Sequence, residues 1–185
     1  SDRGYCIRQY PLFFTELQKT YWKNCGLHDR MRVNISRKKR RVLMNKNAFR
    51  NFSYGVYVVS TLDGERPTGC VANSAMQITS EPATIAVSIN HDNYTNQCIA
   101  KSGLFAISIL SEASDPGLIG TFGFQSGKDV NKFDGINVFA KEGISILADA
   151  CSYVVCKVIR TIEIATHTVF LGEVIDADVL NKEKE

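Results

Sequence analysis

Residues 69–82 read GCVANSAMQITSEP and are the most informative stretch of the chain. A strand carries Ala72, Asn73 and Ser74 into irregular backbone. Amides and small hydroxyl groups there are unpaired by a sheet ladder, so such a turn can bind the polar edge of a planar ring or a phosphate. An ordinary turn at the end of a strand uses the same residue types, and this stretch alone favours the ordinary turn.

Strand patterns lie on both sides of this stretch, because short runs rich in β-branched and aromatic residues alternate with turn signals. We expect strands at residues 54–62, 68–73, 84–90, 104–110, 153–164 and 168–180. Residues 75–80 are expected to be irregular. Short helices are expected at residues 44–52, 94–102 and 115–122; Asn93 caps the second, Gly103 ends it, and Pro116 begins the third.

The order of these elements predicts the fold class. Helices do not alternate with strands, which argues against a doubly wound parallel sheet. We expect a mainly β protein: an antiparallel, Greek-key-like barrel, closed or partly open, with short flanking helices.

Charge divides the chain into two segments. Residues 1–43 hold 11 Lys and Arg against 3 Asp and Glu, whereas residues 44–185 hold 11 against 16. The basic run at residues 36–41 is typical of nucleic-acid binding. However, Arg40 and Arg41 can be encoded as a ribosome-binding sequence at start-codon spacing before Met44. We therefore expect residues 1–43 to be upstream sequence or a disordered basic extension, and residues 44–185 to form the domain.

Several kinds of site are missing from the sequence. No dinucleotide-binding glycine motif, complete P-loop or nucleophile elbow occurs, and the two histidines after Met44 are too few for a multi-histidine metal site. None of the six cysteines forms a C-x-x-C pair, so free buried thiols are expected. No apolar run reaches the length of a membrane span, and no signal-peptide pattern is present. We therefore expect a cytoplasmic protein without a membrane or nucleic-acid partner.

The order and spacing of several segments resemble the flavin reductase-like family of FMN-binding split β-barrels. The resemblance covers residues 44–182, and it includes the stretches GVYVVS (55–60), VSIN (87–90), SGLFAISIL (102–110), GFQSGKDVNKF (123–133) and GEVID (172–176). It implies a homodimer with one FMN per subunit near the subunit interface. It also implies hydride transfer from NADH or NADPH to the flavin, with onward transfer to free flavin or to an electron-carrier protein.

The resemblance also implies roles for individual residues. His167 would orient the nicotinamide, although a structural histidine is a comparable alternative from the sequence alone. The implied FMN-binding residues are Ala72, Asn73 and Ser74 at the ring and ribityl chain; Thr79 and Ser80 at the ring edge or chain; Asn90, Asn93 and Thr95 at the phosphate; and Lys128 and Lys132 as compensating charges or nucleotide contacts. Thr95 and its neighbours would offer helix N-terminal amides to the phosphate.

The sequence departs from the family at one point and leaves alternative functions open. Family members usually continue beyond the last strand, so a C-terminal tail or a fused electron-carrier domain is expected to follow Glu185. The main alternative is an FMN-binding electron carrier with little NAD(P)H oxidation. An oxidase of the pyridoxamine-phosphate type is disfavoured because arginines are few after Met44.

Overall fold

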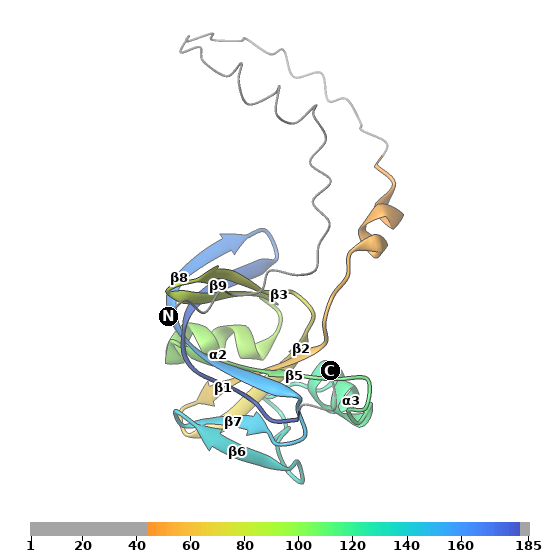
Figure 1. Ribbon diagram of the computed structural model, residues 1–185. Coiled ribbons are helices and arrows are strands. Elements are labelled where there is room, and N and C mark those ends of the chain that lie inside the picture. The colour runs from red at the N-terminus through yellow and green to blue at the C-terminus, as the bar shows by residue number, and fades with distance from the viewer. Residues whose placement is uncertain (1–43, 182–185) are drawn as a thin grey trace, which may run out of the picture. The chain divides into compact units, whose positions relative to one another are not determined.

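A computed structural model describes residues 44–181, and its strands form one seven-stranded antiparallel sheet and one hairpin (Figure 1). The large sheet has the order β2-β1-β5-β8-β9-β4-β3. The elements are η1 (Lys46–Asn51), β1 (Tyr57–Asp63), β2 (Arg66–Ala72), β3 (Ala75–Ser80), β4 (Ala83–Asn90), α2 (Tyr94–Ser102), β5 (Leu104–Ile109), α3 (Gly117–Phe124), β6 (Val138–Lys141), β7 (Ile144–Leu147), β8 (Ser152–Ile164) and β9 (His167–Val179).

The connection between β2 and β3 forces the large sheet to curl. These two strands lie at opposite edges of the sheet, yet only Asn73 and Ser74 separate them. A flat seven-stranded sheet would hold its edge strands about 29 Å apart, at roughly 4.8 Å per strand. The three peptide steps from Ala72 to Ala75 reach at most about 11 Å. The two edges therefore meet at this corner, which is the geometry of a partly open barrel.

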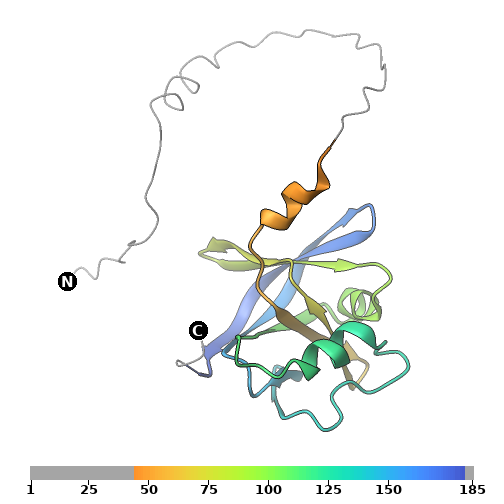
Figure 2. The same cartoon turned by 90° about the vertical axis from the view of Figure 1, so that its right-hand side faces the viewer.

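The long β8–β9 hairpin connects the two halves of the barrel. The first half of β8 pairs with β5, and the first half of β9 pairs with β4. The β8–β9 register shifts between Val155 and Cys156 and again between Val158 and Arg160, and such bulges bend a strand. The tip of the hairpin projects beyond the rest of the barrel (Figures 1 and 2).

One part of the barrel interior is filled by closely packed side chains, and we call it the filled interior: Val59, Cys70, Val87, Ile89, Ile99, Phe105, Ile107, Cys156 and Phe170. Phe105 lies directly over Gly172. A Cβ atom at Gly172 would come within 2.7 Å of the Phe105 ring and 2.6 Å of the Cys156 Cβ. Glycine at position 172 therefore makes room for the aromatic ring.

A second apolar layer covers the other side of β1 and β2. There, Val58 packs with Leu118 and Phe122 of α3, and with Phe133 and Leu147. Phe122 and Phe133 meet edge to face, with ring centroids 5.0 Å apart. Because both sides of β1 are covered, its centre is an unbroken buried run rather than an alternating one.

Most of the expected elements are confirmed, and the helix at residues 94–102 has the predicted ends. Residues 75–80 were expected to be irregular, but they form edge strand β3 because β4 supplies a pairing partner. The helix expected at residues 115–122 lies two residues later, since Asp115 and Pro116 precede it. The β6–β7 hairpin was not predicted. The four cysteines among the described residues are free and buried.

The extension at residues 1–43 lies outside the described residues, so the interpretation of its basic run stays a prediction. Within residues 44–181, no helix is long and apolar enough to cross a bilayer.

Candidate flavin pocket

The corner between β2 and β3 presents polar groups to solvent. Asn73 and Ser74 are both exposed, and the Ser74 hydroxyl donates to the Asn73 side-chain oxygen at 2.9 Å. The carbonyl of Ser74 accepts a hydrogen bond from the Ser88 amide at 2.9 Å, which fixes the corner against β4. Ala72 precedes the corner, half-buried, and packs on the filled interior.

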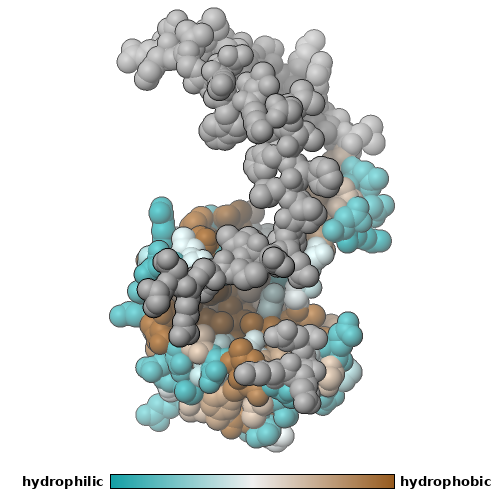
Figure 3. Space-filling model, viewed as in Figure 1, coloured by the Kyte–Doolittle hydropathy of each residue, from teal (hydrophilic) through white to brown (hydrophobic). Residues whose placement is uncertain are grey.

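This corner forms one wall of a surface pocket of about 420 Å³, which lies within the usual range for small-molecule sites. Its opposite wall is the segment before β1. The lining residues are Phe52, Ser53, Tyr54, Gly55, Tyr57, Asn73, Ser74, Ala75, Met76, Ala86, Ser88 and Val169. In the space-filling view, apolar surface borders a hollow in the middle of the molecule (Figure 3).

Aromatic side chains dominate the wall before β1. The Phe52 and Tyr54 rings lie 6.2 Å apart at an interplanar angle of 35°, and both are exposed. The phenol of Tyr57 fills the space beside Gly55, where a Cβ atom would meet the Tyr57 hydroxyl oxygen at 2.2 Å. Glycine at position 55 therefore allows the Tyr57 ring to lie against the backbone.

His167 lies on the same sheet surface as the pocket. In the β4–β9 ladder, Ser88 pairs with Val169 and Asn90 pairs with His167. Side chains two residues apart on a strand share a face, so His167 and Asn90 continue the face on which Val169 and Ser88 line the pocket. The half-buried His167 ring has its Nδ1 atom 2.8 Å from the Thr166 hydroxyl.

The residues predicted to hold a phosphate at α2 already have partners. The Asn93 side-chain oxygen accepts a hydrogen bond from the Thr95 amide at 3.1 Å. The Asn93 backbone carbonyl accepts a hydrogen bond from the Asn96 amide at 2.9 Å. The Asn90 side chain accepts from the Asp92 amide at 2.9 Å. Asn93 is therefore the N-cap of α2, and Thr95 is buried in the first turn. Their predicted contact with a phosphate stays a prediction.

Thr79 and Ser80 lie at the far end of β3 and do not line the pocket. The Thr79 hydroxyl donates to the Pro82 carbonyl at 2.5 Å, within the turn to β4. Both residues are exposed. A contact between these residues and a flavin would need a ligand that extends along β3, so this contact also stays a prediction.

The two lysines have different surroundings. Lys132 is 3% exposed, and its ammonium group donates to the carbonyls of Gly69 at 2.9 Å and Phe122 at 3.1 Å. Burial lowers the pKa of Lys132. Lys132 thus ties the loop after α3 to β2. Lys128 is exposed, and its backbone amide donates to the Ser126 hydroxyl at 3.2 Å. Its predicted contact with a nucleotide stays a prediction.

Sequence reasoning missed the aromatic wall of the pocket. Phe52 and Tyr54 belong to no recognisable motif, and about twenty residues separate them from Asn73 along the chain. Ser88 and Val169 could have been found, because both occupy outward positions of clearly alternating strands.

A family model described as "Flavin reductase like domain" matches residues 49–185. The chain is 42% identical over 139 residues to a high molecular weight rubredoxin of Moorella thermoacetica, covering 74% of this chain and 61% of that protein. It is 37% identical over 139 residues to a ferric-chelate reductase (NAD(P)H) of Archaeoglobus fulgidus, covering 74% of this chain and 82% of that protein.

A solved structure is also similar in fold. An NADH:FAD oxidoreductase of Streptomyces globisporus superposes with a TM-score of 0.67 at 29% identity, covering 71% of this chain and 79% of that one. The fold and the family match therefore agree over the same part of the chain.

Proposed function

Because the chain belongs to the flavin reductase-like family, we propose that it is an NAD(P)H:FMN oxidoreductase. It transfers a hydride from NADH or NADPH to a bound flavin and passes the electrons on to free flavin or to a partner protein. The observation that carries this proposal is the 420 Å³ pocket between the Asn73–Ser74 corner and the aromatic segment before β1.

The pocket suits the ring of a flavin, which has apolar faces and one polar edge. Phe52 and Tyr54 offer aromatic surface to the ring faces, and aromatic pairs favour offset or tilted packing. Asn73 and Ser74 offer exposed polar groups to the ring edge and ribityl chain. When bound, FMN supplies the hydride chemistry, and the residues of this chain position the ring and exclude water.

The remaining predicted residues belong to the same proposal. Asn90, Asn93 and Thr95 lie beyond the pocket, where β4 ends and α2 begins. The phosphate would lie there, after the ribityl chain. Lys128 supplies an exposed positive charge for it. Lys132 is buried, and its role in this proposal is indirect: its hydrogen bond to the Gly69 carbonyl fixes the position of β2. Thr79 and Ser80 would meet the flavin only along the edge of β3.

His167 orients the nicotinamide in this proposal. It stands two residues before Val169 on β9, on the face that carries the pocket. Hydride transfer needs the two rings to be held in a near-attack arrangement, and a neutral imidazole can donate one hydrogen bond to the carboxamide. His167 has no proton-transfer role in this scheme.

The exposed face of the same sheet suits a homodimer. Five large apolar side chains are exposed on β3 and β8: Met76, Ile78, Ile159, Ile162 and Ile164. Apolar patches of this kind mark interaction sites in water-soluble proteins. Sedimentation equilibrium should give twice the chain mass, and Ile162→Glu should shift the population towards the monomer. A protein that is monomeric at all concentrations would remove the dimer from the proposal.

An absorbance spectrum tests the flavin directly. The purified protein should be yellow or should take up one FMN per chain, and FMN should bind more tightly than FAD. Relatives named as FAD reductases make FAD the relevant competitor. Stopped-flow reduction by NADH and by NADPH then identifies the donor. A protein that stays colourless during flavin titration would refute the proposal.

A second candidate function is an FMN-binding electron carrier. It is favoured by the 42% identity to a protein named as a rubredoxin, of which this chain spans only 61%. Tight flavin retention with negligible NAD(P)H oxidation would select this candidate. The predicted cytoplasmic location stays a prediction under either function.

A further inference from the structure

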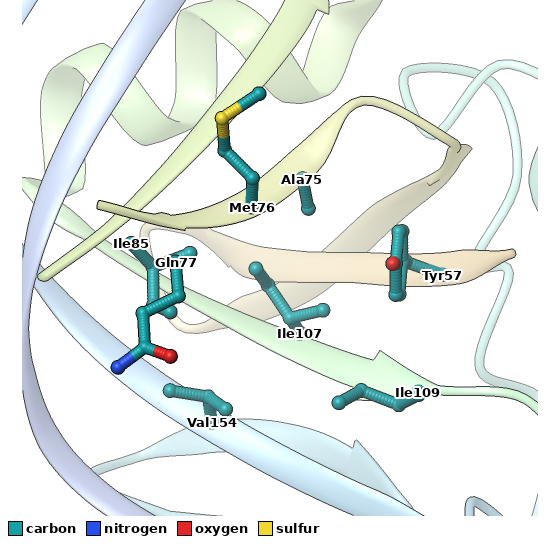
Figure 4. A pocket seen from close by; sticks show the side chains of 8 residues that line it. All are labelled: Tyr57, Ala75, Met76, Gln77, Ile85, Ile107, Ile109 and Val154. Atoms are coloured by element: carbon teal, nitrogen blue, oxygen red, sulfur yellow. The ribbon is translucent and has the colours of Figure 1, made fainter. Parts of the chain in front are cut away.

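A second cavity, of about 200 Å³, lies inside the mouth of the barrel. It separates the β3–β4 layer from the β1, β5 and β8 layer (Figure 4). The lining residues are Tyr57, Ala75, Met76, Gln77, Ile85, Ile107, Ile109 and Val154, and we call this space the hollow mouth.

The walls of the hollow mouth are almost entirely aliphatic. Ile107 and Val154 are cross-strand partners on β5 and β8, and none of the described residues that line the space is charged. Figure 4 places the two polar side chains, Tyr57 and Gln77, towards opposite ends of the cavity. An ionised ligand would lose its hydration there without gaining a countercharge.

The two polar side chains have spare hydrogen-bonding capacity. Within the described part of the chain, the Tyr57 hydroxyl has no hydrogen-bond partner. The Gln77 amide donates one long hydrogen bond, 3.3 Å, to the Thr79 carbonyl. A ligand with oxygen atoms at both ends could therefore bond to both side chains.

The volume of the cavity limits the size of the ligand that it can hold. An apolar cavity of about 150 Å³ is large enough to hold benzene. A cavity of 200 Å³ adds room for small substituents but not for the three fused rings of a flavin. We infer that the hollow mouth binds an uncharged single-ring molecule with oxygen substituents at opposite ring positions.

This site adjoins the proposed flavin pocket without depending on it. Tyr57, Ala75 and Met76 line both spaces, so they form the partition between them. Gln77, Ile107 and Val154 line the hollow mouth but not the proposed flavin pocket. Binding of the ring therefore requires no flavin, and the two proposals can fail separately.

Methyl NMR with 4-methoxyphenol as the probe tests the inference in the flavin-free and the FMN-loaded protein. The δ1 methyl signals of Ile107 and Ile109 should shift and saturate in both forms. Val154→Phe fills the cavity from its wall and should abolish the shifts. The matched control is Ile175→Phe, on the exposed surface of β9, which should bind the probe as the original protein does.

A variant that removes a polar side chain distinguishes hydrogen bonding to the probe from simple filling of the cavity by an apolar ring. Gln77→Leu should weaken 4-methoxyphenol binding roughly two- to tenfold, the usual effect of one hydrogen bond, and should leave toluene binding unchanged or tighter. Gln77 is exposed, so this variant remains informative if Val154→Phe fails to fold.

Three results would overturn the inference. The first is a shift confined to the Val169 and Met76 methyl groups and abolished by FMN, which would place the probe in the flavin pocket. The second is equal binding by the Val154→Phe and Ile175→Phe proteins. The third is an unchanged preference for 4-methoxyphenol over toluene in Gln77→Leu. Failure of flavin uptake with the isoleucine shifts intact would count against the proposed function alone.

Discussion

The filled interior and the hollow mouth belong to the same barrel and share its strands. Strand β1 contributes Val59 to the first and Tyr57 to the second, and β5 contributes Phe105 and Ile109 in the same way. In the filled interior, Phe105 occupies the space that Gly172 leaves. In the hollow mouth, the side chains that line the walls leave a space of about 200 Å³ between them.

This difference predicts that substitutions in one region affect the stability of the fold, whereas substitutions in the other affect ligand binding. Close-packed interiors lose free energy when any atom is added or removed, whereas an open cavity has room for a ligand. Substitutions in the filled interior should therefore alter folding more than binding. Substitutions around the mouth and the neighbouring pocket should do the reverse, and the predictions below test this division.

The largest effect is expected from Gly172→Val. Its Cβ would lie within 2.7 Å of both Phe105 and Cys156, and overpacking of this kind costs about 3 kcal/mol. Urea denaturation followed by circular dichroism measures the loss. The matched control is Gly123→Ala on α3, where the nearest atoms would lie 3.9 Å away; it should gain about 0.5 to 1 kcal/mol. Equal stability of the two variants would contradict the close contact at Gly172.

The next effect concerns His167, which lies outside the filled interior. His167→Ala should keep the fold and the FMN and slow NAD(P)H-dependent flavin reduction by roughly ten- to a hundredfold, at about 1.4 kcal/mol per decade. Photoreduction, which needs no nucleotide, should be unchanged. The control is His91→Ala, because the His91 imidazole faces Glu163 at 2.8 Å. Stopped-flow reduction at the original rate would make His167 a structural histidine.

The fold was predictable wherever a local signal determines an element. The helix at residues 94–102 was placed correctly because Asn93 caps it and Gly103 ends it in the left-handed region, at a φ of 67°. Strand β3 was missed because most of its residues are exposed, so no alternation marks it. The short strands β6 and β7 were missed because four residues carry too little periodicity.

The site was predictable only in part, for a similar reason. Ala72 ends a recognisable strand, and Asn73 and Ser74 form the corner where the barrel edges meet. The wall that contains Phe52 and Tyr54 arises from tertiary contact alone. Whether Lys132 would be exposed could not be read from a polar loop sequence, since its burial depends on the carbonyls of β2 and α3.

Asn93→Ala, at the start of α2, should give a smaller effect. Loss of the N-cap should cost about 1 kcal/mol of stability. If Asn93 also meets the phosphate, FMN affinity should fall severalfold while riboflavin affinity stays the same. Asn93→Asp retains a capping oxygen, so it should keep the stability but weaken FMN binding by charge repulsion. Unchanged FMN binding in both variants would make Asn93 a cap alone.

The smallest effect is a pH dependence at the α2 side of the filled interior. The Tyr94 hydroxyl donates to Asp63 at 2.7 Å and so joins α2 to the end of β1. This hydrogen bond raises the pKa of Tyr94 to about 12. The same bond, followed by that from Arg66, lowers the pKa of Asp63 below its usual 3.8.

The signs of the two shifts fix the pH window. A raised tyrosine pKa gives stability that is complete below pH 10.0 and is lost as pH rises towards about 12. A lowered carboxyl pKa gives stability that is present above pH 3.8 and is lost as pH falls through the folded-state value. The difference in unfolding free energy between the original protein and Tyr94→Phe should therefore be constant from pH 3.8 to 9.0 and should shrink as pH falls below 3.8 or rises from 10.0 towards about 12. Above pH 9.0 the Cys98 thiol, which is hydrogen-bonded to Tyr94 in the original protein, also contributes to the difference. Burial raises the pKa of Cys70 to about 11 and that of Cys156 to about 12, but both thiols titrate in both proteins and cancel in the difference. A difference that is independent of pH across this range would show that the Tyr94 ring, rather than its hydroxyl, holds α2 in place.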